Sequence, residues 1–210
     1  MSAATNIELV TTDGVFALDG GEWEVTNNVW LIGDDTEVLV IDAAHDARAI
    51  ADAVHGRRVT AIALTHGHND HIDAAVALRD LVDAPILLHP ADRMLWDVVH
   101  PDASPDGDLA EGDVLSVAGT DHVVLHTPGH SPGCVCFYDA GGHLFSGDTL
   151  FCGGPGATGR SFSDFDEIIV SIRERLLTLP PETVVHTGHG ESTTIGAEAP
   201  DLAEWLRRGH

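Results

Sequence analysis

The sequence predicts an α/β fold in which two sheets pack face to face and helices cover their outer faces. Strand-like and helix-like runs alternate along the whole chain. The strand-like runs also form two sets, separated by a polar segment at residues 100–112, and helical patterns accompany each set. No linker or internal repeat divides the 210 residues, so we predict a single domain spanning 1–210.

The first half is expected to hold short strands that turn tightly at Gly20-Gly21 and Asp34-Asp35. A continuous apolar run such as Val59–Leu64 is typical of a buried strand. The expected strands are Val15–Leu18, Val29–Ile32, Val38–Ile41, Val59–Leu64 and Ile86–Leu88. Alanine content and helical spacing of apolar residues predict helices at Ala47–Val54, Ile72–Val82 and Ala91–Val99.

The second half repeats this alternation after a surface loop at His100–Gly112, which contains two prolines and several aspartates. Strands are predicted at Val114–Val117, His122–His126, Val135–Tyr138, His143–Phe145 and Thr183–Val185. Apolar residues at helical spacing predict a helix over Phe165–Leu179, which Pro180-Pro181 would end, and a last helix is predicted at Asp201–Arg208.

The composition is strongly acidic and narrows the range of partners. There are 34 acidic residues against 10 arginines and no lysine, giving a formal net charge of −24. Such a charge disfavours nucleic acids and anionic membrane surfaces, so we expect a small-molecule substrate. An odd number of cysteines, with Cys134 and Cys136 in an apolar run, suggests free thiols in a reducing compartment. No signal-peptide pattern follows Met1 and no apolar run is long enough to span a membrane, so the expected location is cytoplasmic.

Four potential metal ligands fall within six residues, directly after a predicted buried strand. They are His66, His68, Asp70 and His71. Gly67 and Asn69 separate them and tolerate unusual backbone angles, so a tight loop can turn the ligands inward. Histidine and carboxylate ligands suit zinc, iron and manganese.

Three more candidate ligands lie at the ends of later strands. His130 follows Gly129 in a turn, Asp148 follows Ser146-Gly147, and His189 stands between two glycines. A ligand at a strand end is held by a rigid scaffold while its side chain faces a cleft.

In this order, the motifs resemble those of the metallo-β-lactamase superfamily, most closely its glyoxalase II-like (hydroxyacylglutathione hydrolase-like) branch. The resemblance spans roughly residues 15–195 and implies a four-layer αβ/βα sandwich of two mixed sheets. It implies that His66, His68 and His130 bind a first metal ion. It implies that Asp70, His71 and His189 bind a second, and that Asp148 bridges the two.

The resemblance also implies the chemistry. A hydroxide held between two divalent ions, zinc with iron or manganese as alternatives, would attack a carbonyl, and Asp70 and Asp148 would be the catalytic carboxylates. A thioester of a low-molecular-weight thiol is the expected substrate, because a thiolate leaves readily. Glutathione is not favoured as that thiol, since the sequence shows no C-terminal helical domain with cationic residues to dock it.

Three alternatives remain open. A mononuclear iron persulfide dioxygenase on this fold would use His66, His130 and Asp148. The same hydroxide could hydrolyse a lactone, and a metal-binding scaffold without catalysis is the third alternative. β-Lactam hydrolysis is not expected, because the resemblance implies that β-lactamases of this superfamily usually carry a cysteine or another non-bridging ligand at the position of Asp148.

Two residues are expected to support the site. Asp42 ends a predicted strand and is expected to orient the ligand loop, with helix capping as the alternative. Arg160 follows a glycine-rich loop near Asp148 and is expected to bind a substrate carboxylate, with a structural ion pair as the alternative. A core hydrogen bond is expected for His186, whereas a surface position is expected for six further histidines: His45, His55, His100, His122, His143 and His210.

Overall fold

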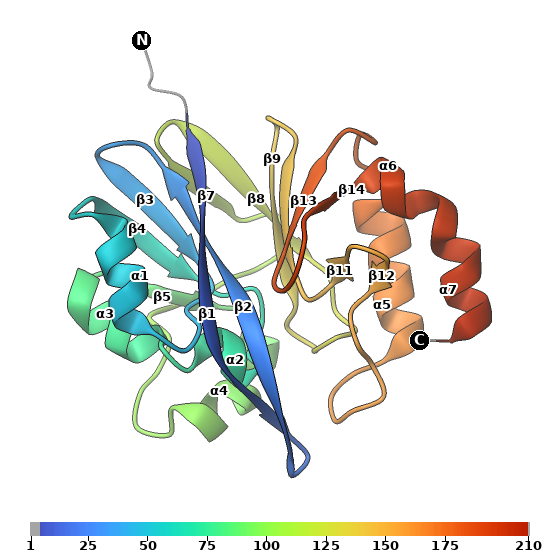
Figure 1. Cartoon of the computed structure of the whole chain (residues 1–210), viewed down its shortest axis with the longest axis horizontal. Helices are drawn as coiled ribbons and strands as arrows, with labels where there is room; N and C mark the ends of the chain where they lie inside the picture. The colour runs from blue at the N-terminus through green and yellow to red at the C-terminus, as the bar shows by residue number, and fades with distance from the viewer. Residues whose placement is uncertain (1–4, 210) are drawn as a thin grey trace.

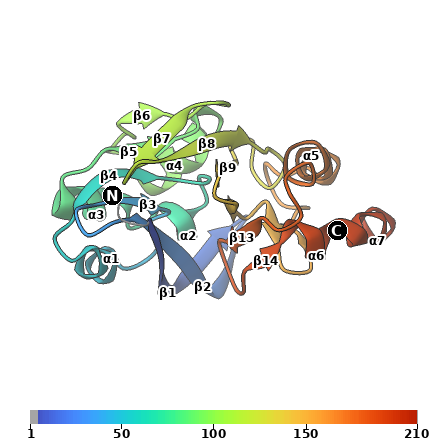
Figure 2. The same ribbon diagram turned by 90° about the horizontal axis from the view of Figure 1, so that it is seen from above.

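The computed structural model describes residues 5–209 and contains two six-stranded sheets within them. Figure 1 shows the sheets facing one another, with helices on both outer sides, and Figure 2 shows the same layers from above. The first sheet has the order β1-β2-β3-β4-β5-β6 and the second the order β14-β13-β10-β9-β8-β7. Both contain parallel and antiparallel pairs, so the predicted sandwich of two mixed sheets is confirmed.

The strands of the first sheet are β1 (Asn6–Leu18), β2 (Gly21–Gly33), β3 (Glu37–Ile41), β4 (Arg58–Ala63), β5 (Ile86–Leu88) and β6 (Gly107–Asp108). Those of the second are β7 (Val114–Val117), β8 (Thr120–His126), β9 (Val135–Asp139), β10 (His143–Gly147), β13 (Val184–Thr187) and β14 (Thr193–Thr194). A separate short ribbon pairs β11 (Leu150–Phe151) with β12 (Gly154–Pro155).

Helices pack on the outer face of each sheet. The first sheet is covered by α1 (Ala47–Val54), α3 (Ala75–Val82) and α4 (Arg93–Val99), and a short α2 (Asn69–Ile72) follows the ligand loop. The second is covered by α5 (Phe165–Ser171), which continues as a π-helical turn (Ile172–Leu176), and by α6 (Ile195–Glu198) and α7 (Leu202–Arg208). None of the helices in residues 5–209 is both long and apolar enough to cross a membrane.

Three buried clusters correspond to the interfaces between the four layers. The central cluster joins the inner faces of the two sheets and includes Ile41, Ala63, Val124 and Phe145. The two outer clusters lie between each sheet and its own helices. Burial of apolar surface on both faces explains why the central strands read as nearly continuous apolar runs.

The largest errors in the predicted boundaries concern the first two strands and the helix after the ligand loop. Strands β1 and β2 are each 13 residues long, whereas only four residues of each were expected. The two strands form one long hairpin, in which every residue from Asn6 to Leu18 pairs with a residue of β2, including the polar positions. The helix expected over Ile72–Val82 is split, because the chain turns at Asp73-Ala74 and α3 begins only at Ala75.

A histidine cluster lies at the start of β10, at the opposite end of that strand from Asp148. His122, Asp139 and His143 are neighbours across β8, β9 and β10. His186 hydrogen-bonds His143 at 3.0 Å, which confirms its expected core hydrogen bond. His122 is completely buried, so the expectation that it lies at the surface was wrong, and His210 lies outside the described residues.

This cluster predicts that the metal-free protein loses stability in acid. Burial, aided by His143, lowers the pKa of His186 from 6.5 to about 4. The unfolded chain therefore takes up a proton below about pH 6.5 that the folded chain resists until about pH 4, so the stability falls across this window. We expect the His186 contribution to be about 2 kcal/mol, after allowing for solvent screening. Urea unfolding at pH 7.5 and 4.5 should show a smaller pH effect for His186→Phe than for the parent, whereas exposed His55→Phe should match the parent.

Candidate metal centre

The seven predicted ligands converge between the two sheets, on loops that follow strands of both. Loop 66–71 follows β4, Asp148 follows β10 and His189 follows β13, while His130 lies in the turn between β8 and β9. Six of the seven residues are buried, and His189 is partly exposed. The structure therefore brings together the seven side chains that the sequence motifs singled out.

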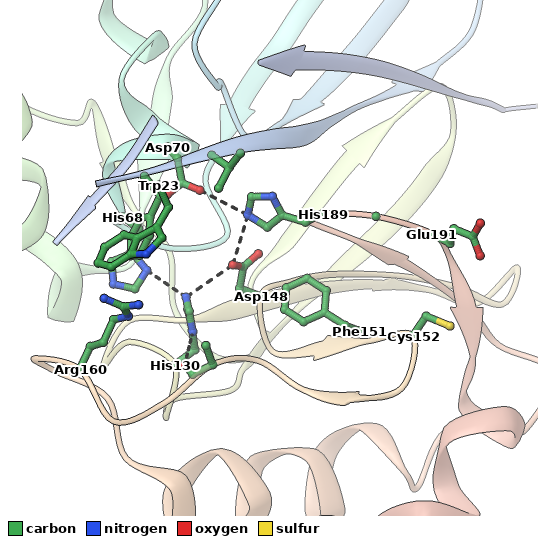
Figure 3. A pocket seen from close by; sticks show the side chains of 14 residues that line it. Trp23, His68, Asp70, His130, Asp148, Phe151, Cys152, Arg160, His189 and Glu191 are labelled. Carbon is green, nitrogen blue, oxygen red and sulfur yellow. Dashed lines mark hydrogen bonds and ion pairs between the residues drawn. The ribbon is translucent and has the colours of Figure 1, made fainter. Parts of the chain in front are cut away.

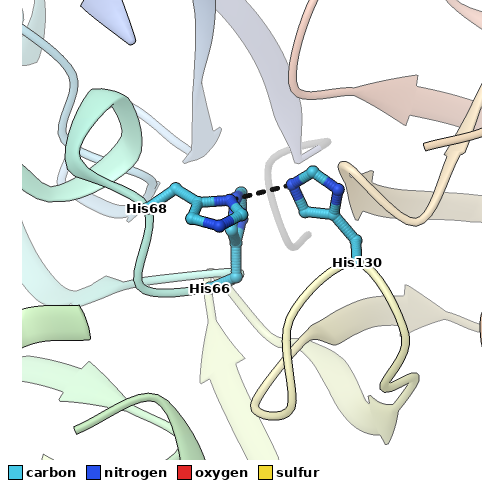
Figure 4. A group of neighbouring side chains, drawn as sticks. All are labelled: His66, His68 and His130. Carbon is cyan, nitrogen blue, oxygen red and sulfur yellow. Dashed lines mark hydrogen bonds between the residues drawn. The ribbon is translucent and has the colours of Figure 1, made fainter. Parts of the chain in front are cut away.

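The first group of possible ligands consists of His66, His68 and His130. One nitrogen from each ring lies within 4.8 Å of one nitrogen from each of the others. Figure 4 shows His68 and His130 facing one another, with 2.9 Å between His68 Nδ1 and His130 Nε2. His130 Nδ1 donates to the carbonyl oxygen of Ala157 at 2.8 Å, so its Nε2 is the nitrogen that faces the group.

The second group consists of Asp70, His71 and His189, whose ligand atoms also lie within 4.8 Å of one another. His189 Nε2 lies 3.3 Å from Asp70 Oδ2. His189 Nδ1 donates to the carbonyl oxygen of Thr26 at 2.8 Å, which leaves Nε2 pointing into the site.

Asp148 lies between the two groups. Its Oδ2 is 3.6 Å from His130 Nε2 in the first group and 3.5 Å from His189 Nε2 in the second. Its Oδ1 is 3.3 Å from His71 Nε2. Gly188 permits this close packing, because a Cβ there would lie 2.3 Å from Asp148 Oδ1.

The pKa directions differ between the two groups. Burial and the neighbouring His130 lower the pKa of His68 to about 3. Burial alone would lower the pKa of His189, but Asp148 raises it to about 10. Burial would raise the pKa of Asp70, but His71 lowers it to about 2. His68 is therefore a neutral imidazole at neutral pH, whereas Asp70 is an ionised carboxylate.

Several buried atoms of the cluster have no hydrogen-bond partner among residues 5–209. They are His66 Nε2, His68 Nε2, Asp70 Oδ1 and Asp148 Oδ1. Buried polar atoms are rarely left unpaired, so this concentration indicates that the site is completed by something other than protein. Imidazole and carboxylate donors suit divalent transition metals, and the cluster is suited to two such ions.

Asp42 orients two of the imidazoles. Its Oδ2 lies 2.8 Å from His71 Nδ1, and its Oδ1 accepts the backbone N–H of Thr65 at 2.8 Å. The Thr65 hydroxyl also donates to Asp42 and lies 3.1 Å from His66 Nδ1. Asp42 adopts a positive φ of 63°, a left-handed backbone conformation that aspartate tolerates better than most residues.

Sequence reasoning missed Asn27 and His45. Asn27 Nδ2 donates to Asp70 Oδ2 at 3.1 Å and lies 3.3 Å from His71 Nε2. His45 was expected at the surface, but only 5% of its side chain is exposed, and its Nε2 lies 3.0 Å from Asn27 Oδ1. The signal available was a polar Asn27-Asn28 pair directly before the apolar half of β2.

Asp92 was also missed, because it lies inside a predicted helix and no motif marks it. It is fully buried between the two loops that supply the first group. Its carboxylate accepts the backbone N–H of Gly67 at 2.7 Å and of Gly133 at 2.6 Å, and the Ser131 hydroxyl at 2.6 Å. One carboxylate therefore fixes the loop of His66 and His68 relative to the loop of His130.

A cavity of about 460 Å³ opens onto the cluster, as Figure 3 shows. Its apolar lining comes from Phe16, Trp23 and Val25 of the β1–β2 hairpin and from Phe151 and Ala157. Arg160 lies over the Trp23 ring, 3.8 Å from its centroid. Among residues 5–209 the Arg160 guanidinium contacts the Phe16 and Trp23 rings and forms no salt bridge, while its charge also acts on the nearby Asp19 carboxylate.

The sequence profile of the metallo-β-lactamase superfamily matches residues 23–189. The chain belongs to this superfamily. GloC of Haemophilus influenzae, a hydroxyacylglutathione hydrolase, is 32% identical over 188 residues, with coverage of 81% of this chain and 89% of GloC. This similarity is consistent with the glyoxalase II-like branch.

Two solved structures of the superfamily are similar over most of their length. BLEG-1, described as a B3 metallo-β-lactamase, has a TM-score of 0.77 and 31% identity, covering 90% of this chain and 97% of BLEG-1. TTHA1623 in a di-iron-bound form has a TM-score of 0.73 and 37% identity, covering 83% of this chain and 93% of TTHA1623. The superfamily consists largely of metal-dependent hydrolases.

Proposed function

We propose that this protein is a dinuclear metal-dependent hydrolase that cleaves a thioester of a low-molecular-weight thiol. The observation that carries the proposal is the position of Asp148, between a group of three histidines and a group of one aspartate and two histidines. His66, His68 and His130 would hold one ion, and Asp70, His71 and His189 the other, with Asp148 shared.

Two divalent ions held there would supply an activated water and would polarise a carbonyl group. The chain's own residues set the geometry. Asp42 holds the His71 ring, and Asn27 holds Asp70 through Oδ2. Asp70 Oδ1 has no hydrogen-bond partner, so it can accept a hydrogen bond from the attacking water and orient it. In the net reaction, water adds its oxygen to the acyl carbon, the C–S bond breaks, and an acid and a thiol leave.

Metal analysis combined with a substrate panel tests this proposal. We expect two ions per chain, and metal-dependent hydrolysis of thioesters after reconstitution with zinc, iron or manganese. The panel should include S-lactoylglutathione, a lactone, a β-lactam and glutathione persulfide. A single iron with oxygen uptake on the persulfide would contradict the proposal in favour of a dioxygenase. Full metal occupancy without any turnover would favour a scaffold.

Arg160 is the one arginine that lines the cavity in the described part of the chain, and we propose that it binds an anionic group of the substrate. Arg160→Ala should raise KM for a carboxylate-bearing thioester about tenfold or more, because a charge-assisted hydrogen bond is lost. KM for a neutral thioester should change little. Exposed Arg48→Ala is the matched control, since it changes the net charge equally. Equal KM increases for both substrates would contradict this role.

A further inference from the structure

The wall of the cavity nearest the first ligand group is built by the β1–β2 hairpin. Phe16 and Trp23 are direct cross-strand partners, and their ring centroids are 5.6 Å apart. Val25 lies on the same face, two residues beyond Trp23. The Phe16 ring stands edge-on to His68, with 5.3 Å between centroids. Apolar surface therefore reaches directly to a predicted metal ligand.

The rest of the lining extends this apolar character. In Figure 3, Phe151 and Trp23 lie on opposite sides of Asp148. The centroid of the Phe151 ring is 6.1 Å from that of the His189 ring. Outside the predicted ligand set, the charged residues lining the cavity are Arg160 and Glu191. Because the Phe16 ring contacts His68, a group beside the reacting carbonyl can pack against apolar surface.

Asn69 fixes the position of this wall. Its Nδ2 donates to the carbonyl oxygen of Val15 at 2.7 Å, and its Oδ1 accepts the N–H of Ala17 at 2.8 Å. These two backbone groups flank Phe16 on the outer edge of β1, so the amide side chain replaces a neighbouring strand. Asn69 itself stands between His68 and Asp70, which links the hairpin directly to the ligand loop.

We propose that the hairpin selects substrates that carry an apolar, ring-sized group beside the reacting carbonyl, and that Asn69 is the positioning residue of this specificity element. The inference rests on the proposed function, since the reaction concerned is thioester hydrolysis. The preference for binding apolar groups can be measured without that reaction. The apolar group could belong to the acyl part or to the thiol part of the thioester, since both flank the same carbonyl. The shared requirement is apolar surface against Phe16 and Trp23.

A panel of three neutral thioesters separates these sources. It comprises an acetyl ester of 2-mercaptoethanol, a phenylacetyl ester of the same thiol and an acetyl ester of 2-phenylethanethiol. Trp23→Ala should lower kcat/KM for one or both ring-bearing substrates about tenfold or more, and change it less than twofold for the small substrate. The ring-bearing substrate whose kcat/KM falls shows whether the apolar group belongs to the acyl part or to the thiol part. Leu9→Ala, an exposed position on β1 outside the cavity lining, should leave all three unchanged.

Asn69→Leu tests the positioning role with a side chain of similar size that cannot pair with β1. It should reproduce the selective loss on ring-bearing substrates while the protein keeps two metal ions and its melting temperature to within a few degrees. A uniform loss on all substrates, or an unchanged preference, would overturn the role of Asn69. If its metal content falls, Trp23→Ala decides whether the hairpin is the specificity element.

A binding measurement keeps the inference distinct from the proposed activity. Trp23 is 39% exposed, whereas the other three tryptophans are buried. Phenylacetate added to the metal-loaded protein should therefore change the fluorescence of Trp23. Its dissociation constant should be at least tenfold lower than that of acetate, measured by competition. Equal affinities would overturn the inference even if thioesters are hydrolysed. Tight phenylacetate binding without thioester hydrolysis would refute the proposed reaction and leave the apolar preference standing.

Discussion

Asp148→Ala is expected to abolish hydrolysis and to lower the metal content below two ions per chain. The carboxylate lies between both ligand groups, 3.6 Å from His130 Nε2 and 3.5 Å from His189 Nε2, so its removal affects both ions at once. We expect kcat to fall by roughly a thousandfold or more, which corresponds to about 4 kcal/mol of lost transition-state stabilisation.

Metal quantitation and steady-state kinetics on the same preparation check this expectation. Asp139→Ala is a useful control, because that carboxylate is also buried but ends β9, beside the start of β10 and away from Asp148. It can affect stability without touching the ligand groups. If the Asp148 variant keeps two ions and full activity, the bridging role is refuted.

Asp92→Ala should give the second large effect, although Asp92 is not itself a predicted ligand. Truncation leaves two backbone N–H groups and the Ser131 hydroxyl without their buried acceptor. We expect a loss of roughly 2–4 kcal/mol in the free energy of unfolding. We also expect metal affinity at the first group to fall about 10–100-fold, because the loops of His66 and His130 lose their common anchor.

Competition with a chelator distinguishes the two sites in this experiment. In the Asp92 variant, one ion should be lost at a much lower chelator concentration, while the other remains as tightly bound as in the parent. Asp80→Ala, with 72% of its side chain exposed, is the matched control and should leave both ions in place. Equal weakening of the two ions would show that Asp92 supports the whole fold and not the first group.

The sequence predicted the layered fold and the meeting of the seven ligand residues because both depend on local patterns. Apolar runs identify buried strands, and glycine-flanked histidines and aspartates at strand ends identify the ligand loops. The supporting residues depend on contacts between segments distant in the chain. Asp92 is 41 residues from Gly133, and Asn27 is 43 residues from Asp70, so no short motif reveals them.

The hairpin was underestimated for a related reason. Near the turn of the hairpin, the alternation of polar and apolar residues that marks a strand is weak. The apolar residues there, such as Phe16 and Trp23, face the cavity and not the core. Only pairing between β1 and β2 shows that Phe16 and Trp23 lie side by side. Similarly, the burial of His45 follows from its bonds to Asp73 and Asn27, which its own neighbourhood in the sequence does not indicate.

The candidate ligands come from both halves of the sandwich: loop 66–71 from the first sheet, and His130, Asp148 and His189 from the second. Ions held by these residues would cross-link the two sheets at their central interface. Any opening of the two halves would have to break coordination bonds as well as apolar contacts, so occupancy would be linked to the integrity of the whole domain. The availability of metal would then affect the lifetime of the folded protein as well as its catalytic rate.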